Sequence, residues 1–360
     1  MNLIRRLFVA IRKKRELRKW KVRITKNFKD LENHRKLTKS QKTEIQDFYK
    51  SMIGRKVPLY CHEYFYSRTG HYTKEYVPNN FYHCELVPRA NVQSLKTAYG
   101  DKNMCDLLFP GERIVHTILK NMNGYYYYEG EAVSEEEAIS KCRDLKNVII
   151  KPSRASEGKG VQLFSVKDGI TTIEEKSIGQ LFKDYKRNYL IQEWVRQHKD
   201  MAALNPTSVN TIRILSYRSG MEVLIIYSVV RIGRIGSVVD NQCAGGISTT
   251  ISEHGQLGRF AFGGFSKDNI VKTDTGILLD GYQLPSYEKA LAFVKRLHLK
   301  LPFFDLVGWD VAIQEDGEPV LIEFNTNPGL SQSAFGSGMG KYTERIIREL
   351  WKKPNTWFPD

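Results

Sequence analysis

The chain has 360 residues, of which 41% are hydrophobic and 26% are charged, as is ordinary for a globular protein with its own buried core. No stretch approaches the roughly 18 uninterrupted apolar residues of a membrane-spanning helix, and the five cysteines form no C-x-x-C pair. The composition therefore argues against a membrane-spanning protein, a disulfide framework and a zinc knuckle, and it favours the reducing cytoplasm.

The net charge of +15 is concentrated at the N-terminal end. Residues 1–42 contain 16 Lys and Arg against 3 Asp and Glu. Leu3, Leu7 and Ile11 recur at helical spacing, with basic residues on the other face. A basic amphipathic helix is typical of segments that lie on anionic membranes. We therefore hypothesise peripheral contact of residues 1–25 with the inner face of the membrane. The alternative is that the apolar stripe packs on the body or on a second subunit. Nucleic-acid binding is not expected, because no binding motif accompanies the charge.

The sequence divides into four predicted segments, the first two of which precede the motifs discussed below. Residues 1–55 are a basic helical arm, in which a second helix is predicted from Ser40 to Tyr49, ending near Gly54. Residues 56–95 are rich in Tyr, His and Phe and are interrupted by prolines. This stretch is expected to be a small N-terminal segment or a lid, and its fold stays open.

The third segment, residues 96–195, contains a strand that ends in a lysine. Val148 to Ile150 is apolar, and Lys151 follows directly. A lysine at the end of a buried strand is costly without an anionic partner. The next loop contains Gly158 and Gly160, which allow backbone N–H groups to approach phosphates. It is not a Walker A loop, because no Ser or Thr follows its lysine. The alternative, a glycine hairpin with solvated basic residues, leaves Lys151 unexplained.

Two weaker features flank the lysine strand. Lys102 follows Asp101, a suitable N-cap for a short helix over residues 104–108. As a dipeptide this is a weak signal, and the alternative is an exposed surface lysine. Residues 189–195 are predicted to form a strand. Asp200 follows this strand, and on its own it would be an ordinary loop acid.

The fourth segment, residues 196–360, places two arginines within apolar strands. An unpaired guanidinium there is expensive, so Arg213 and Arg231 need anionic partners. A phosphate or acyl phosphate, bound bidentately, is one candidate partner. The alternative is a buried ion pair with Glu222 or Asp240.

A predicted β-hairpin in the same segment gathers three oxygen ligands. Residues 311–313 and 320–322 are two apolar strands joined by a D-G turn. Asp310 is expected to open the first strand, and Glu323 and Asn325 to close the second on one face. Two carboxylates and an amide oxygen at one edge suit Mg²⁺ together with substrate phosphates. The alternative is a surface hairpin with solvated acids.

Taken in chain order, these motifs resemble the ATP-grasp superfamily. The K-P-S…S-x-G-x-G loop and the E-x-N-x-x-P-G run are similar to the phosphate and metal motifs of D-alanine–D-alanine ligase. The run from Asn205 to Arg213, with Asp240-Asn241 and Gly245-Gly246, resembles the sugar-transfer-associated branch. The resemblance implies an α+β ATP-grasp fold, in which two α+β halves grip ATP between antiparallel sheets.

The resemblance also implies a role for each candidate site residue. The two lysines would hold phosphates, and the glycine loop would close over them. The end of the strand over residues 189–195 would be the hinge between the two halves and would bind adenine, and an acid after it would bind the ribose. These nucleotide-binding residues are Lys102, Lys151, Ser156, Gly158, Gly160, Glu193, Val195 and Asp200. Two Mg²⁺ ions would be held by Asp310, Glu323 and Asn325, and transferred charge would be stabilised by Arg213 and Arg231.

The activity implied by the resemblance is ATP-dependent carboxylate–amine ligation through an acyl phosphate, in polysaccharide or glycoconjugate biosynthesis. The cofactors would be ATP and Mg²⁺, and the partners a carboxylate and an amine, with sugar-linked substrates as one option. The alternative enzyme is an ATP-grasp kinase that phosphorylates a hydroxyl of a sugar-type or other small acceptor. A third class is a non-catalytic nucleotide-binding module, against which the intact metal and phosphate motifs argue.

Overall fold

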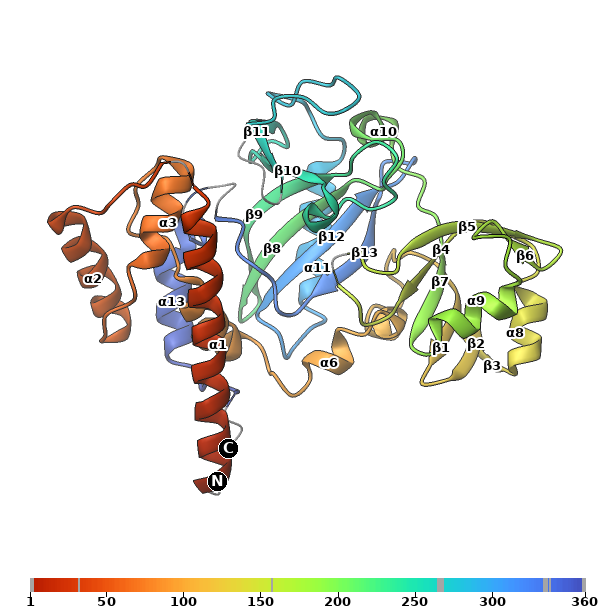
Figure 1. Ribbon diagram of the computed structural model, residues 1–360, viewed down its shortest axis with the longest axis horizontal. Helices are drawn as coiled ribbons and strands as arrows, with labels where there is room; N and C mark the ends of the chain where they lie inside the picture. Colours follow the sequence, from red (N-terminus) through yellow and green to blue (C-terminus); the bar gives the residue numbers. More distant parts are fainter. Residues whose placement is uncertain are drawn as a thin grey trace.

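The computed structural model describes residues 3–31, 33–156, 158–263, 269–332, 336 and 338–357. Figure 1 shows two β-sheets beside each other and a group of helices beyond the second sheet. Every strand pairing in this described part of the chain's two sheets is antiparallel. The predicted α+β fold with two antiparallel sheets is therefore confirmed.

The first sheet belongs to the predicted nucleotide-binding half. In spatial order its strands are β3 (Glu131–Val133), β2 (Tyr125–Tyr128), β1 (Thr117–Met122), β7 (Tyr189–Glu193), β4 (Leu145–Pro152), β5 (Gln162–Lys167) and β6 (Ile170–Thr171). Apolar side chains of α8 (Glu135–Lys141) and α9 (Ile178–Tyr185) share one core with these strands. The helix α8 begins with a capping box, in which Ser134 and Glu137 bond to each other's backbone N–H groups.

The second sheet forms the centre of the molecule. In spatial order its strands are β11 (Leu257–Gly263), β10 (Ile247–Ile251), β9 (Glu222–Ile232), β8 (Thr211–Ser219), β12 (Leu306–Ile313) and β13 (Pro319–Asn325). All eight residues of β12 are buried, because layers of helices cover both of its faces. On one face, α10 (Lys199–Leu204) and α11 (Tyr287–His298) share a core with the strands.

The other face of the second sheet packs against the N-terminal helices and the last helix. These are α2 (Lys39–Ile53), α4 (Asn79–Phe81), the π-helical turn η1 (Tyr82–Leu86), α5 (Val87–Ala90) and α13 (Thr343–Trp351). Residues 56–95, whose fold the sequence left open, are thus helical and also contain α3 (Tyr60–Thr69). The predicted second helix is confirmed as α2, which ends at Gly54 in a left-handed conformation, φ 70°.

The helix α1 (Leu3–Lys29) crosses this helical group at its C-terminal half. Ile24 is buried against Tyr64 and Phe65 of α3. The N-terminal half of α1 extends past the rest of the molecule (Figure 1). The predicted packing of α1 on the body is therefore found for its second half, whereas the side chains of residues 3–10, which carry most of the predicted apolar stripe, lie outside the described set. None of the described helices is both long and apolar enough to cross a membrane.

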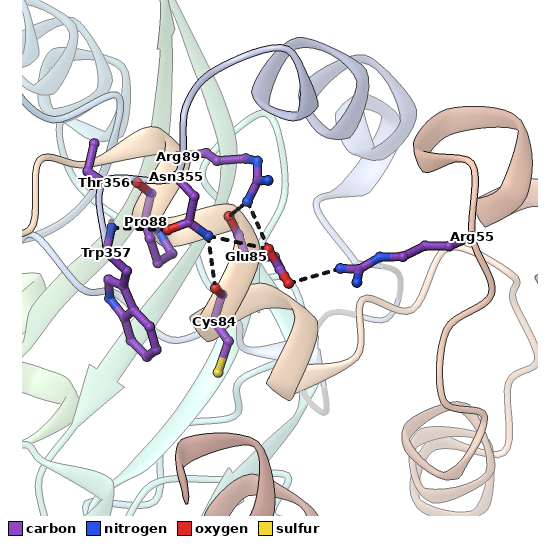
Figure 2. Close-up of polar contacts among 8 residues, drawn as sticks. All are labelled: Arg55, Cys84, Glu85, Pro88, Arg89, Asn355, Thr356 and Trp357. Carbon is purple, nitrogen blue, oxygen red and sulfur yellow. Dashed lines mark hydrogen bonds and ion pairs between the residues drawn. The ribbon is translucent and has the colours of Figure 1, made fainter. Parts of the chain in front are cut away.

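Glu85 in η1 connects the N-terminal helices to the end of the chain (Figure 2). Its buried carboxylate accepts hydrogen bonds from Arg55 Nη2 at 2.9 Å and from Arg89 Nη1 at 2.8 Å. Asn355 Nδ2 donates to the same carboxylate and to the Cys84 carbonyl, each at 3.3 Å. The two guanidiniums offset the buried charge of Glu85. The Asn355 amide, through its hydrogen bonds to Glu85 and Cys84, holds the C-terminal segment against η1.

Between the N-terminal helices and the first sheet lie three short helices, α6 (Lys96–Tyr99), the 3₁₀ turn η2 (Lys102–Met104) and α7 (Cys105–Leu108). Two further 3₁₀ turns are η3 (Gln242–Ala244) and η4 (Gly340–Tyr342). One expectation needs correction. Asp310 was expected to open its strand, but it lies in the middle of β12, which begins four residues earlier at Leu306. The turn between β8 and β9 consists of Gly220 and Met221, since Ser219 pairs with Glu222.

Candidate active site

A cavity lies between the two sheets, where β4 and β7 face β12 and β13. Most of the predicted site residues line it, and they come from both halves of the molecule. They are Lys102, Lys151, Ser156, Gly158, Glu193, Val195, Arg231, Asp310 and Glu323. Four predicted residues do not line this cavity, namely Gly160, Asp200, Arg213 and Asn325. Arg213 and Asn325 instead line an adjoining cavity that also includes Arg231 and Glu323.

Lys151 is the buried cation of the cavity. It lies on β4 opposite Leu190 of β7, with 8% of its surface exposed. No residue of the described chain forms an ion pair or hydrogen bond with its ammonium group. The pKa of Lys151 is lowered to about 8, chiefly by burial; Glu323 opposes this shift and Lys102 adds to it. A buried ammonium without a direct partner is the condition expected of a group that binds an anionic ligand.

Lys102 connects the glycine loop to the predicted metal site. Its backbone N–H donates to the Ser153 carbonyl at 3.0 Å. Its ammonium donates to the Ala155 carbonyl at 2.8 Å and lies 3.3 Å from Glu323 Oε2. As predicted, Asp101 caps the turn that Lys102 begins, accepting from Asn103 N–H. The alternative of an exposed surface lysine is wrong, since Lys102 is only 17% exposed.

The glycine loop reaches across to the second half of the molecule. Gly158 has φ +72°, and a Cβ there would lie 2.7 Å from Asn241 Oδ1. Gly160 has φ +71°, and a Cβ there would lie 3.0 Å from the Pro152 ring. Both positions therefore require glycine, one for contact between the halves and the other for contact with its own strand. Ser156 contributes to both cavities.

The predicted hinge is only partly matched by the structure. Val195 is buried in the cavity lining, and its N–H donates no hydrogen bond within the described residues, so it is available to an adenine. The Glu193 side chain is exposed and lies 3.3 Å from His116 Nδ1. Asp200 lies in the first turn of α10, where its N–H donates to His198 Nδ1 at 3.2 Å. Its ribose role stays a prediction, because its side chain, 46% exposed, lies outside the cavity lining.

The two buried arginines share one carboxylate. Arg213 donates to both oxygens of Asp310, through Nε to Oδ1 and through Nη2 to Oδ2. Arg231 Nη1 donates to Asp310 Oδ2 at 3.3 Å. The alternative of a buried ion pair is therefore found, with Asp310 as the acid. The prediction of Glu222 or Asp240 as that acid was wrong. Burial opposes ionisation of Asp310, but the two guanidiniums outweigh burial and hold its pKa well below the usual range.

The predicted metal ligands converge on this carboxylate. Asp310 and Glu323 are register partners on β12 and β13, and their side chains are within hydrogen-bonding reach of each other. Asn325 Oδ1 accepts from Asn327 N–H at 2.8 Å. In the described chain no three His, Cys, Asp or Glu side chains form a metal cluster. Two carboxylates and an amide nevertheless fit Mg²⁺, which needs only one or two protein carboxylates besides phosphate oxygens.

The acceptor capacity of Asp310 also permits a cation. A carboxylate oxygen has two lone-pair positions. Both positions on Oδ2 are used by arginines, and Oδ1 accepts from Arg213 Nε. A cation at this point would therefore share Asp310 with Arg213.

Sequence reasoning did not assign Asp240 to the site. It lines the cavity, and its Oδ2 accepts from both the N–H and the hydroxyl of Thr211. Burial raises the pKa of Asp240 to about 6, against the opposing effect of Arg231. The sequence suggested Asp240 only as a possible ion-pair partner of the arginines, because no spacing rule places this acid beside β8.

A comparison with protein families found one match for this chain. The model of the sugar-transfer associated ATP-grasp family matches residues 82–347. A search of curated proteins found no match. The chain belongs to the sugar-transfer associated ATP-grasp family, since the matched region is well over half of its length. The family region begins in η1, so α1, α2 and α3 lie outside it.

Three solved structures are distantly similar to this chain. L-amino acid ligase from Bacillus licheniformis is 10% identical, with 72% of this chain and 49% of that chain covered and a TM-score of 0.39. The ADP complex of N5-carboxyaminoimidazole ribonucleotide synthetase is 14% identical, with 74% and 55% covered and a TM-score of 0.44. D-alanine–D-alanine ligase from Bacillus anthracis is 13% identical, with 72% and 67% covered and a TM-score of 0.37. The chain spans about half the length of the first two.

Proposed function

We propose that this protein is an ATP-dependent carboxylate–amine ligase that forms an amide through an acyl phosphate. The observation that supports it most directly is the position of Lys151. Its buried ammonium lacks a direct partner in the described chain and shares one cavity with the Asp310–Glu323 carboxylate pair. A cation for phosphates beside carboxylates for Mg²⁺ is the arrangement that phosphoryl transfer needs.

Each part of the cavity has a task in this proposal. Lys151 and Lys102 hold the ATP phosphates, with the Gly158 loop closed over them. The Val195 N–H and the apolar lining around it receive the adenine. Asp310, Glu323 and Asn325 would hold Mg²⁺, which offsets phosphate charge when bound. The roles of Glu193, Gly160 and Asp200 remain those implied by the resemblance.

The reaction has two steps. A carboxylate oxygen of the acceptor attacks the γ-phosphorus of ATP, the bond to the β-phosphate oxygen breaks, and ADP leaves. The amine then attacks the carbonyl carbon of the acyl phosphate, which releases phosphate and a proton and leaves an amide. Arg231, which lines both cavities, and Arg213, which lines the adjoining one, stabilise the transferred phosphoryl charge. No side chain forms a covalent intermediate.

The proposed substrate class is supported by the name of the family. A sugar-transfer association supports a role in polysaccharide or glycoconjugate biosynthesis, with a sugar acid as the carboxylate. We place the enzyme in the cytoplasm, where ATP is available and free cysteines persist; Cys61, Cys84, Cys105 and Cys142 are free thiols. Contact of α1 with the membrane is the remaining part of this proposal.

An ADP-release assay tests the reaction type. With Mg²⁺-ATP and a panel of sugar acids, we expect release that requires both a carboxylate and an amine. Lys151→Met and Glu323→Gln should abolish it. Glu318→Gln should not, since Glu318 lies just before β13 and pairs with Lys289 outside both cavities. A stable phosphorylated product formed from a hydroxyl acceptor without amine would instead establish the kinase alternative. Nucleotide binding without turnover on any acceptor would support a binding module.

A further inference from the structure

A second, larger cavity adjoins the proposed ATP site. Its volume is about 790 Å³, within the range of sites that enclose a drug-sized ligand. Its lining shares six residues with the first cavity, namely Lys102, Ala155, Ser156, Arg231, Asn241 and Glu323. They include Lys102 and Glu323, to which the proposed function assigns phosphate and metal binding, so a ligand in the second cavity would lie next to the phosphoryl group.

The far wall of this cavity is built from α1 and the helices next to it. Trp20, Arg23 and Asn27 of α1 line it, as do Tyr64 of α3 and His83 of η1. The residues from α1 and α3 lie outside the region matched by the family model. The second half of α1 is thus part of a cavity wall. This holds whether or not the first half of α1 contacts a membrane.

The cavity is strongly cationic. Its lining contains six Lys and Arg side chains and a single carboxylate, that of Glu323. Several of these cations are compensated within the chain, since Arg213 and Arg231 pair with Asp310, and Lys102 pairs with Glu323. Arg23 differs, because no described residue forms an ion pair with it.

Arg23 is held in position by an aromatic stack. Its guanidinium lies 5.4 Å from the centroid of the Trp20 ring. The other partner of Trp20 is His83, whose ring stacks on it at 4.2 Å with an interplanar angle of 5°. A side-chain hydrogen bond joins His83 to Asn327, whose N–H donates to Asn325 Oδ1. A continuous set of contacts therefore connects α1 to Asn325, one of the predicted metal ligands.

We propose that the second cavity binds the carboxylate acceptor, and that Arg23 of α1 binds a second anionic group at the acceptor's far end. The acceptor class is therefore a dianion with a reacting carboxylate and a distal carboxylate or phosphate. This proposal rests on the proposed function for the identity of the reacting group. It adds a specificity-determining residue that lies outside the family region.

The test uses sugar acids as probes on full-length protein saturated with Mg²⁺-ADP. The probes are glucuronate with one anionic group, galactarate with two carboxylates, and glucuronic acid 1-phosphate with a carboxylate and a phosphate. Calorimetric dissociation constants are measured for wild type, Arg23→Ala, Arg23→Lys and Arg18→Ala. Arg18 is a matched control, since it is an exposed arginine of the same helix that does not line the cavity.

We expect at least one dianion to bind wild type at least tenfold more tightly than glucuronate does. Arg23→Ala should remove that advantage, Arg23→Lys should retain part of it, and Arg18→Ala should retain all of it. The preferred dianion identifies the distal group as carboxylate or phosphate. Equal binding of all three probes to wild type, or an advantage that survives in Arg23→Ala, would overturn the inference. The proposed function is judged separately, because Mg²⁺-ADP binding and its loss in Lys151→Met do not depend on Arg23.

Discussion

Arg213 and Asp310 are register partners on the adjacent strands β8 and β12, and the guanidinium binds both oxygens of the carboxylate. Glu323 is the register partner of Asp310 on the other side, on β13. The three residues therefore form one row across the sheet, in the order Arg213, Asp310, Glu323. Asp310 both neutralises the arginines and is available as a metal ligand.

Asp310→Ala should destabilise the protein. Its removal leaves Arg213 and Arg231 buried without their common partner, which typically costs about 3–5 kcal/mol. Urea denaturation measures the loss in the free energy of unfolding. The control is Glu222→Ala, which breaks an exposed pair with Arg345 and should leave the free energy of unfolding nearly unchanged. Equal losses for the two variants would show that the arginines do not depend on Asp310.

Substitution of Lys151 should affect stability and nucleotide binding in opposite directions. The pKa of Lys151 is lowered from 10.5 to about 8, because burial disfavours the charged form. Below pH 8 the buried ammonium is charged in the folded protein, and its desolvation lowers the free energy of unfolding by its full amount. Between pH 8 and 10.5 the unfolded chain binds more protons, so this group's contribution to unfolding free energy rises with pH.

Lys151→Met removes that buried charge, so we expect an unchanged or higher melting temperature with at least tenfold weaker ATP binding. In the wild type, ATP affinity should fall as pH rises through 8, because the ammonium that binds phosphate is lost. Lys151→Arg is the control, since its charge persists to high pH. An affinity that is flat from pH 7 to 9 in wild type would contradict the role given to Lys151.

The Glu85 cluster should be structural only. Glu85→Gln weakens charge-assisted hydrogen bonds to Arg55 and Arg89, so we expect a loss of about 1.5–3 kcal/mol in unfolding free energy. ATP binding by the folded variant should be unchanged, since Glu85 lines neither cavity. Glu344→Gln, at an exposed pair with Arg348, is the matched control. A nucleotide-binding defect in the folded Glu85 variant would link this cluster to the site.

Removal of residues 1–13 tests membrane contact without touching the cavity wall at Trp20 and Arg23. We expect the full chain to co-sediment with vesicles that contain anionic lipid, and expect the shortened chain to lose most of that binding. High salt should weaken the interaction, because it screens the basic face. Equal binding of both chains would exclude the first half of α1 as the contact.

Local sequence signals predicted much of the site. The strand ending at Lys151, the glycine loop and the D-G hairpin each depend on neighbouring residues, and all were found close to their predicted positions. The pairing of Arg213 with Asp310 was not predictable in this way. It depends on the register of two strands whose residues lie 97 positions apart, and residue spacing alone does not specify such a register.

The second half of α1 shows another limit of sequence reasoning. Charge and amphipathicity suggested a membrane-binding arm. Ile24 instead packs against α3, and Arg23 lines a cavity. The same apolar spacing serves membrane contact and tertiary packing, so the pattern does not distinguish them.

The central claim is a Mg²⁺-dependent nucleotide site that requires Glu323. It is tested most directly by the melting temperature with and without a non-hydrolysable ATP analogue, each with and without Mg²⁺. We expect a Mg²⁺-dependent rise of several degrees in wild type and in Glu318→Gln, and its loss in Glu323→Gln. The same rise in Glu323→Gln, or no rise in wild type, would contradict the account.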